Sequence, residues 1–164
     1  MLRMTDPTDG LISFQDALSN GAITLLRGDV DPELFVHMDS PAGNPRFSYV
    51  RLDGAEVTAF VTFVPSERFE GAPCFQIGYA VPEKFRNEGR AQEAVQAAIA
   101  EMQHGFARTQ IATFYVEAIV GADNVASQHV AEKTISSSPT LVTDSVSKNP
   151  ALQYMRRVER PTAR

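Results

Sequence analysis

The sequence is short of cysteine, of long apolar runs and of positive charge, and each shortage argues against a class of protein. Its one cysteine, Cys74, cannot form an internal disulfide, fits a reducing compartment, and reads better as a small apolar strand residue than as a catalytic thiol. No apolar run approaches the roughly 20 residues of a membrane-spanning helix. The net charge of −5 argues against sequence-independent binding to nucleic acid or anionic membranes. Any bound anion must therefore be held by local groups.

Several catalytic and metal-binding patterns are missing as well. Three scattered histidines and one cysteine lack the spacing of a zinc site. The chain also has no nucleophile elbow, no Walker loop and no dinucleotide Gly-x-Gly-x-x-Gly. We therefore expect a reaction that needs no metal. Residues 1–10 are polar and acidic, so we expect no secretory signal and, by default, a cytoplasmic location.

Length and composition fit one ordinary domain. The chain has 164 residues, of which 43% are hydrophobic and 21% are charged. A globule of this size buries roughly 70% of its unfolded surface, enough for a proper core. No repeat, low-complexity tract or flexible linker divides the chain. We expect a single domain over residues 1–164.

Local patterns predict a mixture of strands and helices. Asp53-Gly54, a dipeptide favoured in tight turns, separates two β-rich runs and predicts an antiparallel hairpin. Asp31-Pro32-Glu33 has the form of a capped helix start and predicts a short helix over Glu33–Met38. The other patterns predict strands over residues 22–26, 47–52, 57–64, 74–81, 111–120, 141–146 and 151–158, and helices over 12–18, 89–102 and from Asp123 or Asn124 to about Thr134.

The stretch from Val81 to Ala91 carries the functional signal, because a strand ends there and a helix of small residues begins. The first turn of a helix leaves four amides without partners, and its dipole favours an anion. Gly89 and Ala91 leave room for a bulky diphosphate to approach the main chain. Lys84, Arg86 and Arg90 add positive charge, and the stretch therefore predicts a phosphate site.

Arg86-x-x-Gly89-x-Ala91 after a strand resembles the acyl-CoA signature of the GNAT superfamily, Gln/Arg-x-x-Gly-x-Gly/Ala. The segment from Val116 to Lys133, with Asn124-x-x-Ser127 and a Glu-Lys pair, resembles the strand and helix that follow this signature. The resemblance spans about residues 47–158. It implies an α/β (α+β) fold, with a mixed central sheet of about six to seven strands flanked by helices and with parallel strands four and five splayed apart.

The resemblance also implies a set of contacts to acetyl-CoA, the expected acyl donor. The pantetheine arm would pair with the main chain of Tyr79, Ala80 and Val81 and would form a hydrogen bond with Asn124. The amides of residues 86–91 would hold the pyrophosphate: Arg86, Asn87, Glu88, Gly89, Arg90 and Ala91. Many family members carry a tyrosine acid where this chain has Ala131. The Asn-x-x-Ser motif instead resembles the branch of the family that acetylates ribosomal-protein N-termini. In this branch the serine is the proposed acid, so Ser127 is the candidate acid; the alternative is that Ser127 is a small residue that allows close packing.

Glu117 is the candidate general base, because a carboxylate in an otherwise apolar strand is expected to have its pKa raised by desolvation. A solvent-facing position or a structural ion pair is the other interpretation. The acceptor implied is an amine, either a small molecule or a peptide N-terminus. Family members have two helices between the first two strands, whereas only residues 27–47 are available here. The acceptor groove is then either open to a large substrate or completed by a second subunit in a homodimer.

Two other functions stay open from sequence. A GNAT-like module that binds acyl-CoA without turnover would use the same loop, and so would a nucleotide-binding protein.

Overall fold

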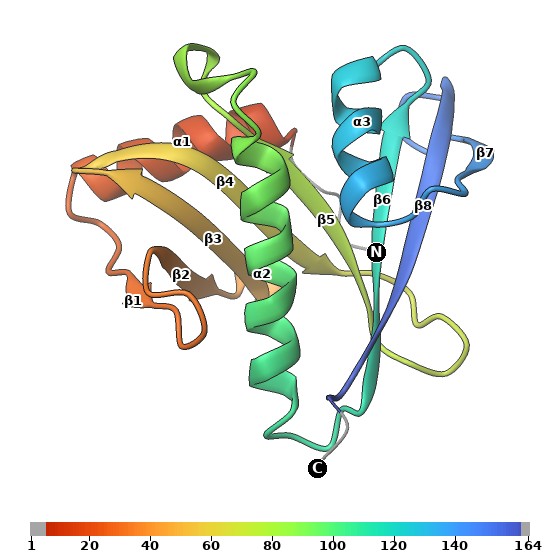
Figure 1. Ribbon diagram of the computed structural model, residues 1–164, viewed down its shortest axis with the longest axis horizontal. Helices are drawn as coiled ribbons and strands as arrows, with labels where there is room; N and C mark the ends of the chain where they lie inside the picture. The colour runs from red at the N-terminus through yellow and green to blue at the C-terminus, as the bar shows by residue number, and fades with distance from the viewer. Residues whose placement is uncertain (1–5, 162–164) are drawn as a thin grey trace.

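One mixed sheet of eight strands forms the centre of the computed structural model, which describes residues 6–161 (Figure 1). The strand order is β1-β2-β3-β4-β5-β6-β8-β7, and every neighbouring pair is antiparallel except β5 and β6. This arrangement confirms the expected fold class. Residues 1–5, within the expected polar leading segment, and residues 162–164, at the end of the expected domain, lie outside the described residues.

The elements follow the chain in this order: α1 (Pro7–Ser19), β1 (Leu26–Arg27), β2 (Leu34–Asp39), β3 (Arg46–Asp53), β4 (Glu56–Pro65), β5 (Cys74–Ala80), α2 (Arg90–Phe106), β6 (Thr113–Gly121), α3 (Val125–Thr134), β7 (Thr140–Thr143) and β8 (Pro150–Glu159). Single-turn 3-10 helices occupy Pro41–Gly43 and Glu83–Phe85.

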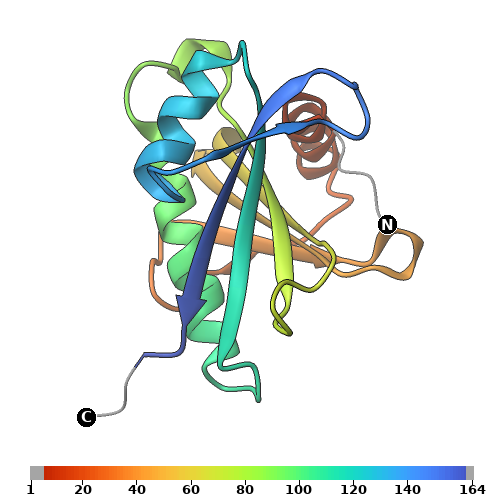
Figure 2. The same cartoon turned by 90° about the vertical axis from the view of Figure 1, so that its right-hand side faces the viewer.

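Helix α1 covers one face of the sheet, and α2 and α3 cover the other (Figure 2). Strand residues therefore alternate between two cores. The larger core lies under α2 and α3 and contains the fully buried side chains of Phe63, Val95 and Ile99. The smaller core lies under α1, where Leu11 and Phe14 pack on the sheet. Helix α1 packs on β4 and β5, and the smaller core contains no residue of β6 or β8, so that part of the sheet has no helix of residues 6–161 on its α1 face.

Gln15 fastens α1 to the hairpin between β3 and β4. Its side-chain oxygen accepts a hydrogen bond from the Val57 amide at 2.7 Å, and its nitrogen donates to the Ala55 carbonyl at 3.0 Å. The hairpin itself is the one predicted from Asp53-Gly54, and Gly54 has the left-handed φ of +63° that this turn requires.

The predicted helix over Glu33–Met38 is wrong, because these residues form β2. The Asp31 side chain does accept a hydrogen bond from the Glu33 amide, at 2.9 Å, as a helix cap would. However, the Leu34 amide then bonds back to the Asp31 carbonyl, which makes a tight turn, and the chain continues as a strand paired along its whole length with β3. The Asp-Pro signal is shared by helix starts and by turns of this kind.

Other boundaries differ from the predicted ones for local reasons. Of residues 22–26 only Leu26 is in a strand, since Ile23 and Leu25 pack on the smaller core instead of pairing. The strand predicted over 141–146 ends at Thr143, where Asp144 accepts the Val146 amide and starts a turn. Between Arg27 and Phe47 the chain forms β2 and one 3-10 turn, so neither family helix is present there among the described residues. Strand β2 is therefore the strand that the sequence did not predict, and it brings the sheet to eight strands.

Candidate functional site

Strands β5 and β6 start side by side and then part. Only Cys74, Phe75 and Gln76 pair with β6, opposite Tyr115, Val116 and Glu117. Beyond Gln76, the edge of β5 that faces β6 has no strand partner among residues 6–161, although β5 continues to Ala80. Figure 1 shows the two strands diverging toward the end where α2 and α3 both begin. The splayed parallel pair expected from the resemblance is therefore present.

The segment between β5 and α2 turns the chain with two residues in left-handed conformation, Asn87 (φ +64°) and Gly89 (φ +76°). Asparagine and glycine are the residues that adopt this conformation most readily. Gly89 is the N-cap of α2 and offers no side-chain acceptor to the amides behind it. The helix predicted from residue 89 thus begins at Arg90 and continues to Phe106, four residues beyond the predicted end.

The amides of this segment are free. Within the described part of the chain, the backbone N–H groups of residues 87–92 donate to no acceptor, and the first amide of the region that does so is Glu93, bonded to the Gly89 carbonyl at 3.1 Å. Residues 86–89 are exposed, and an ideal Cβ on Gly89 would meet no atom within 4 Å. A run of unpaired donors at the positive end of a helix, with open space before it, fits an anion such as a diphosphate.

The basic side chains of the segment are held in different ways. Arg86 donates from Nε to the Val81 carbonyl at 2.9 Å, which ties the loop to the end of β5. Arg90 pairs with Glu88 at 2.8 Å and lies over the Phe85 ring. Lys84 forms an ion pair with Glu56 and points to the β3–β4 hairpin. Arg86 is the only one of the three without an acidic partner among residues 6–161.

The start of α3 faces the parted section of β5. Asn124 is the N-cap, and its side-chain oxygen accepts the Ser127 amide at 3.1 Å. Ser127 also contacts Tyr79 twice: the Tyr79 hydroxyl donates to the Ser127 carbonyl at 2.7 Å, and the Ser127 hydroxyl donates to the Tyr79 oxygen at 3.0 Å. Burial raises the pKa of Tyr79 to about 12, against a smaller opposing effect of the Ser127 hydrogen bond.

Glu117 lies at the point where the strands part, because Gln76 opposite Glu117 is the last pair between β5 and β6. It is half-buried, and its carboxylate accepts a hydrogen bond from Gln153 of β8 at 2.7 Å. Its neighbours Val116 and Ala118 belong to the core under α2 and α3, so Glu117 points to the opposite face of the sheet. Ser127 and Glu117 are therefore on different faces, on either side of the parting.

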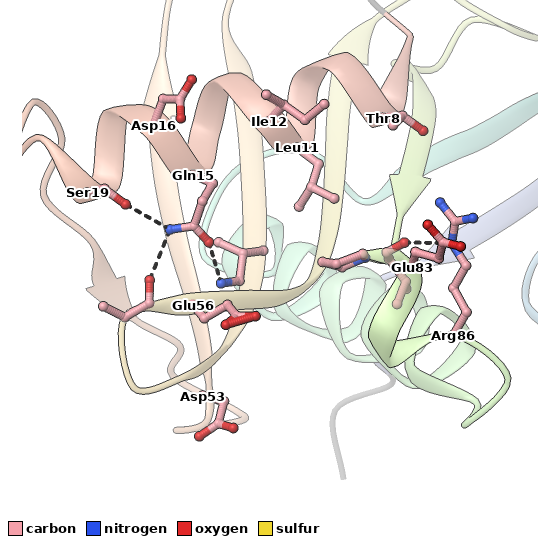
Figure 3. A pocket seen from close by; sticks show the side chains of 14 residues that line it. Thr8, Leu11, Ile12, Gln15, Asp16, Ser19, Asp53, Glu56, Glu83 and Arg86 are labelled. Atoms are coloured by element: carbon pink, nitrogen blue, oxygen red, sulfur yellow. Dashed lines mark hydrogen bonds between the residues drawn. The ribbon is translucent and has the colours of Figure 1, made fainter.

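A separate cavity of about 770 Å³ lies between α1, the β3–β4 hairpin and the segment after β5 (Figure 3). Leu11, Ile12, Val57 and Val81 supply its apolar wall. Four carboxylates line it together with Arg86, namely Asp16, Asp53, Glu56 and Glu83. Figure 3 shows Glu83 and Arg86 at one end of the cavity and Asp53 and Glu56 along its floor. Negative charge predominates there, although Lys84 offsets part of it.

Cys74 is buried, and burial raises the pKa of its thiol to about 12. Both findings agree with an unreactive strand residue. No three His, Cys, Asp or Glu side chains are grouped as a metal would need, within residues 6–161. None of the helices described is long and apolar enough to cross a membrane.

Two side chains at the site have roles that the sequence did not indicate. The prediction used only the main chain of Tyr79, whereas its hydroxyl makes the contact to Ser127 across 48 positions of sequence. Gln153, which binds Glu117 from 36 positions away, carries no motif of its own. An alternating strand pattern with one tyrosine at its end was the only available signal for Tyr79.

Comparison with known proteins identifies the fold. The chain is similar in structure to a GNAT acetyltransferase from Streptococcus pneumoniae, with a TM-score of 0.54 and 12% identity over 96% of this chain and 98% of that one. It is also similar to RimL, the ribosomal L7/L12 alpha-N-protein acetyltransferase solved with coenzyme A, with a TM-score of 0.51 and 21% identity over 71% of this chain. The ribosomal-protein-S5-alanine acetyltransferase of Vibrio fischeri gives 0.52 and 14% over 70% of this chain.

The chain spans 64% of the length of RimL and 62% of that of the S5-alanine enzyme. A comparison with curated proteins found no match. The family model of the acetyltransferase (GNAT) domain matches residues 34–134, which run from β2 through the parted strands and the free amides to the end of α3. The chain belongs to the GNAT acetyltransferase family.

Proposed function

We propose that this protein transfers an acetyl or other short acyl group from acetyl-CoA to a primary amine by direct attack. The observation that carries the proposal is the row of unpaired amides at residues 87–92, placed at the open end of the parted strands β5 and β6. Family membership sets the class of reaction, and RimL, a neighbour in fold, was solved with coenzyme A.

The donor fits this site in three places. The diphosphate is held by the free amides of residues 87–91, whereas the Arg86 amide, also expected there, donates to the Glu83 carbonyl at 3.2 Å. The Arg86 side chain is the nearby cation that no carboxylate neutralises. The pantetheine arm adds to the free edge of β5 at Tyr79, Ala80 and Val81, as an extra strand would. Asn124 uses its side-chain oxygen as a cap, which leaves its NH₂ group to donate to a pantetheine carbonyl.

The chemistry then takes place near the point of parting. Glu117 approaches from the face that α1 only partly covers, and accepts a proton from the attacking amine directly or through water. Ser127 approaches from the α3 side and donates a proton to the thiolate of coenzyme A as it leaves. A base and an acid on opposite faces of one slot suit a reaction in which the acceptor and the donor enter from opposite sides.

The acceptor is an amine, either a small molecule or a peptide N-terminus. By their names, RimL is an alpha-N-protein acetyltransferase and the other enzyme acetylates ribosomal protein S5 at alanine, which makes a peptide the first acceptor to test. The acidic lining of the 770 Å³ cavity has the charge sign that suits a cationic amine. No α-helix lies within residues 27–47, which leaves room for a large acceptor on that side.

Acceptor-dependent release of coenzyme A thiol tests the proposal. Purified protein is incubated with acetyl-CoA and a panel of peptides with free N-termini, lysine peptides, polyamines and amino sugars, and products are identified by mass. We expect at least one amine to gain an acetyl group. Glu117→Gln, which keeps a partner for Gln153, should lower kcat/KM by about 100-fold or more, whereas Glu67→Gln in the exposed β4–β5 loop should leave it unchanged.

The two competing functions predict different results in the same experiment. Thermal stabilisation by acetyl-CoA with no thiol release from any acceptor would indicate a module that binds acyl-CoA without turnover. Stabilisation by ATP in preference to acetyl-CoA would indicate a nucleotide-binding protein. Either result would overturn the proposed transfer reaction.

A further inference from the structure

Tyr79 and Ser127 join the two sides of the parted strands. Tyr79 lies on β5 three residues beyond the last pair with β6, and Ser127 lies in the first turn of α3, which follows β6 directly. Their two hydrogen bonds, of 2.7 and 3.0 Å, are the only ones between β5 and α3 within residues 6–161. The pair therefore sits in the slot through which the proposed pantetheine arm must reach the thioester.

The surroundings of the pair hold its hydroxyl groups in place. The Tyr79 ring packs against the core under α2 and α3, while its hydroxyl reaches the half-buried Ser127. The Ser127 backbone is fixed by the Asn124 cap. Both hydroxyl protons are directed at defined acceptors, and the two oxygens are already at hydrogen-bonding distance. Transfer of a proton from Tyr79 to Ser127 requires only that the Tyr79 hydroxyl turn from the Ser127 carbonyl to the Ser127 oxygen.

We propose that Tyr79 acts through Ser127 as a two-hydroxyl relay that protonates the coenzyme A thiolate; this inference rests on the proposed function. As the carbon–sulfur bond of the tetrahedral intermediate breaks, its electron pair goes to sulfur. The Ser127 hydroxyl proton moves to sulfur, and the Tyr79 proton moves to the Ser127 oxygen. The proton that Glu117 takes from the attacking amine returns to the Tyr79 phenolate through water, which restores both groups. The products are the amide and coenzyme A thiol, with no net change in either hydroxyl.

The phenol supplies what serine alone lacks. An aliphatic hydroxyl is a far weaker acid than a thiol, so an isolated serine would be left as a strongly basic alkoxide after giving up its proton. A phenol is much closer to a thiol in acidity, with reference pKa values of about 10 and 8.5. A relay that leaves the negative charge on Tyr79 therefore avoids the alkoxide. Burial raises the pKa of Tyr79 to about 12, which keeps the phenol protonated through the neutral range. The raised pKa makes Tyr79 a weaker acid than a free phenol, but still a stronger acid than an aliphatic hydroxyl.

The test compares Tyr79→Phe, Ser127→Ala and the double variant with the wild type in the thiol-release assay. Each single variant should lower kcat by about 100-fold or more with the KM for acetyl-CoA unchanged, and the double variant should lose no more than either single one. Tyr154→Phe is the matched control, because Tyr154 lies close enough to act on the charge of Tyr79, and its hydroxyl makes no hydrogen bond to another residue among 6–161. Circular dichroism and thermal unfolding check that each variant is folded.

A second measurement separates proton transfer from a structural role. Site-specific replacement of Tyr79 by a fluorinated tyrosine keeps the ring and both hydrogen bonds but makes the phenol more acidic. The relay predicts that the alkaline decline of kcat moves to lower pH by the amount that fluorination lowers the phenol pKa. A hydroxyl that only holds α3 in place predicts no such movement.

The outcomes distinguish the relay from the reaction it serves. An active wild type together with an equally active Tyr79→Phe, or a fluorinated enzyme with an unmoved pH profile, would overturn the relay and leave the transferase standing. A wild type that releases no thiol with any acceptor would overturn both.

Discussion

Two glycines of the same helix should respond to alanine with opposite signs. Gly89, the N-cap of α2, has a φ of +76°, whereas Gly105 lies within the helix near its end. A Cβ added at either position meets no atom within 4 Å. Crowding is therefore absent at both positions, and only the backbone conformation differs between them.

The magnitudes follow from the backbone. An alanine in left-handed conformation costs about 1–2 kcal/mol, and the loss of unfolded-state freedom returns about 0.4–1 kcal/mol. Gly89→Ala should therefore lower the free energy of unfolding by about 1 kcal/mol. Gly105→Ala should raise it by about 0.5–1 kcal/mol, since alanine is the better helix former. For a chain of this length each kcal/mol corresponds to roughly 2–4 °C in Tm.

Urea and thermal unfolding of both variants measure these changes, and titration with coenzyme A follows on the same samples. Gly89→Ala should also weaken coenzyme A binding, because the strain falls on the backbone that carries the free amides, while Gly105→Ala should bind like the wild type. A Gly89→Ala protein that is as stable as the wild type and binds coenzyme A equally well would refute both the strain argument and the assigned loop.

Three further predictions follow from contacts elsewhere in the chain. The Glu101 carboxylate of α2 accepts hydrogen bonds from the amides of Asp29, Val30 and Asp31 at 3.1, 2.5 and 2.8 Å. Glu101→Ala should therefore lower the free energy of urea unfolding by about 2–3 kcal/mol, whereas Glu67→Ala should change it by less than about 0.5 kcal/mol. Equal stability of the two variants would contradict a stabilising role for these hydrogen bonds. With its pKa raised to about 12, the Cys74 thiol should react with a disulfide reagent at neutral pH roughly a thousandfold more slowly in the native than in the urea-unfolded protein. Comparable reaction rates in the two states would show an accessible thiol. Folding raises the pKa of Tyr79 to about 12, so the stability that this shift contributes is complete below about pH 10 and is lost as the pH rises toward 12. Between about pH 10 and 12, Tyr79→Phe should therefore lose less stability than the wild type. Parallel losses in the two proteins would contradict the burial of the phenol.

The parts of the fold that could be predicted are those set by short-range signals. The β3–β4 hairpin follows from Asp53-Gly54 and two β-rich runs, and α3 follows from the capping side chain of Asn124. The loop before α2 was predictable for the same reason, because Pro82 and Gly89 end one element and start the next within a few residues. These signals require no knowledge of distant contacts.

The parts that could not be predicted depend on partners far along the chain. Asp31-Pro32 is compatible with the start of a helix or with a turn, and the residues that follow form a turn and then β2 because they pair with β3. The edge position of β1 leaves it only two residues long. The Tyr79–Ser127 contact arises because β5 and α3 meet across the parted strands, a consequence of the sheet order that no local pattern contains.

The assignment of coenzyme A to this site depends on contact between its diphosphate and the free amides of residues 87–91. An NMR titration of ¹⁵N-labelled protein with coenzyme A tests it at the atoms concerned, with pantetheine, which lacks the diphosphate, as the comparison. The amide signals of residues 87–91 should shift most with coenzyme A and stay in place with pantetheine. Saturating coenzyme A that leaves these signals unmoved, or pantetheine that moves them equally, would contradict it.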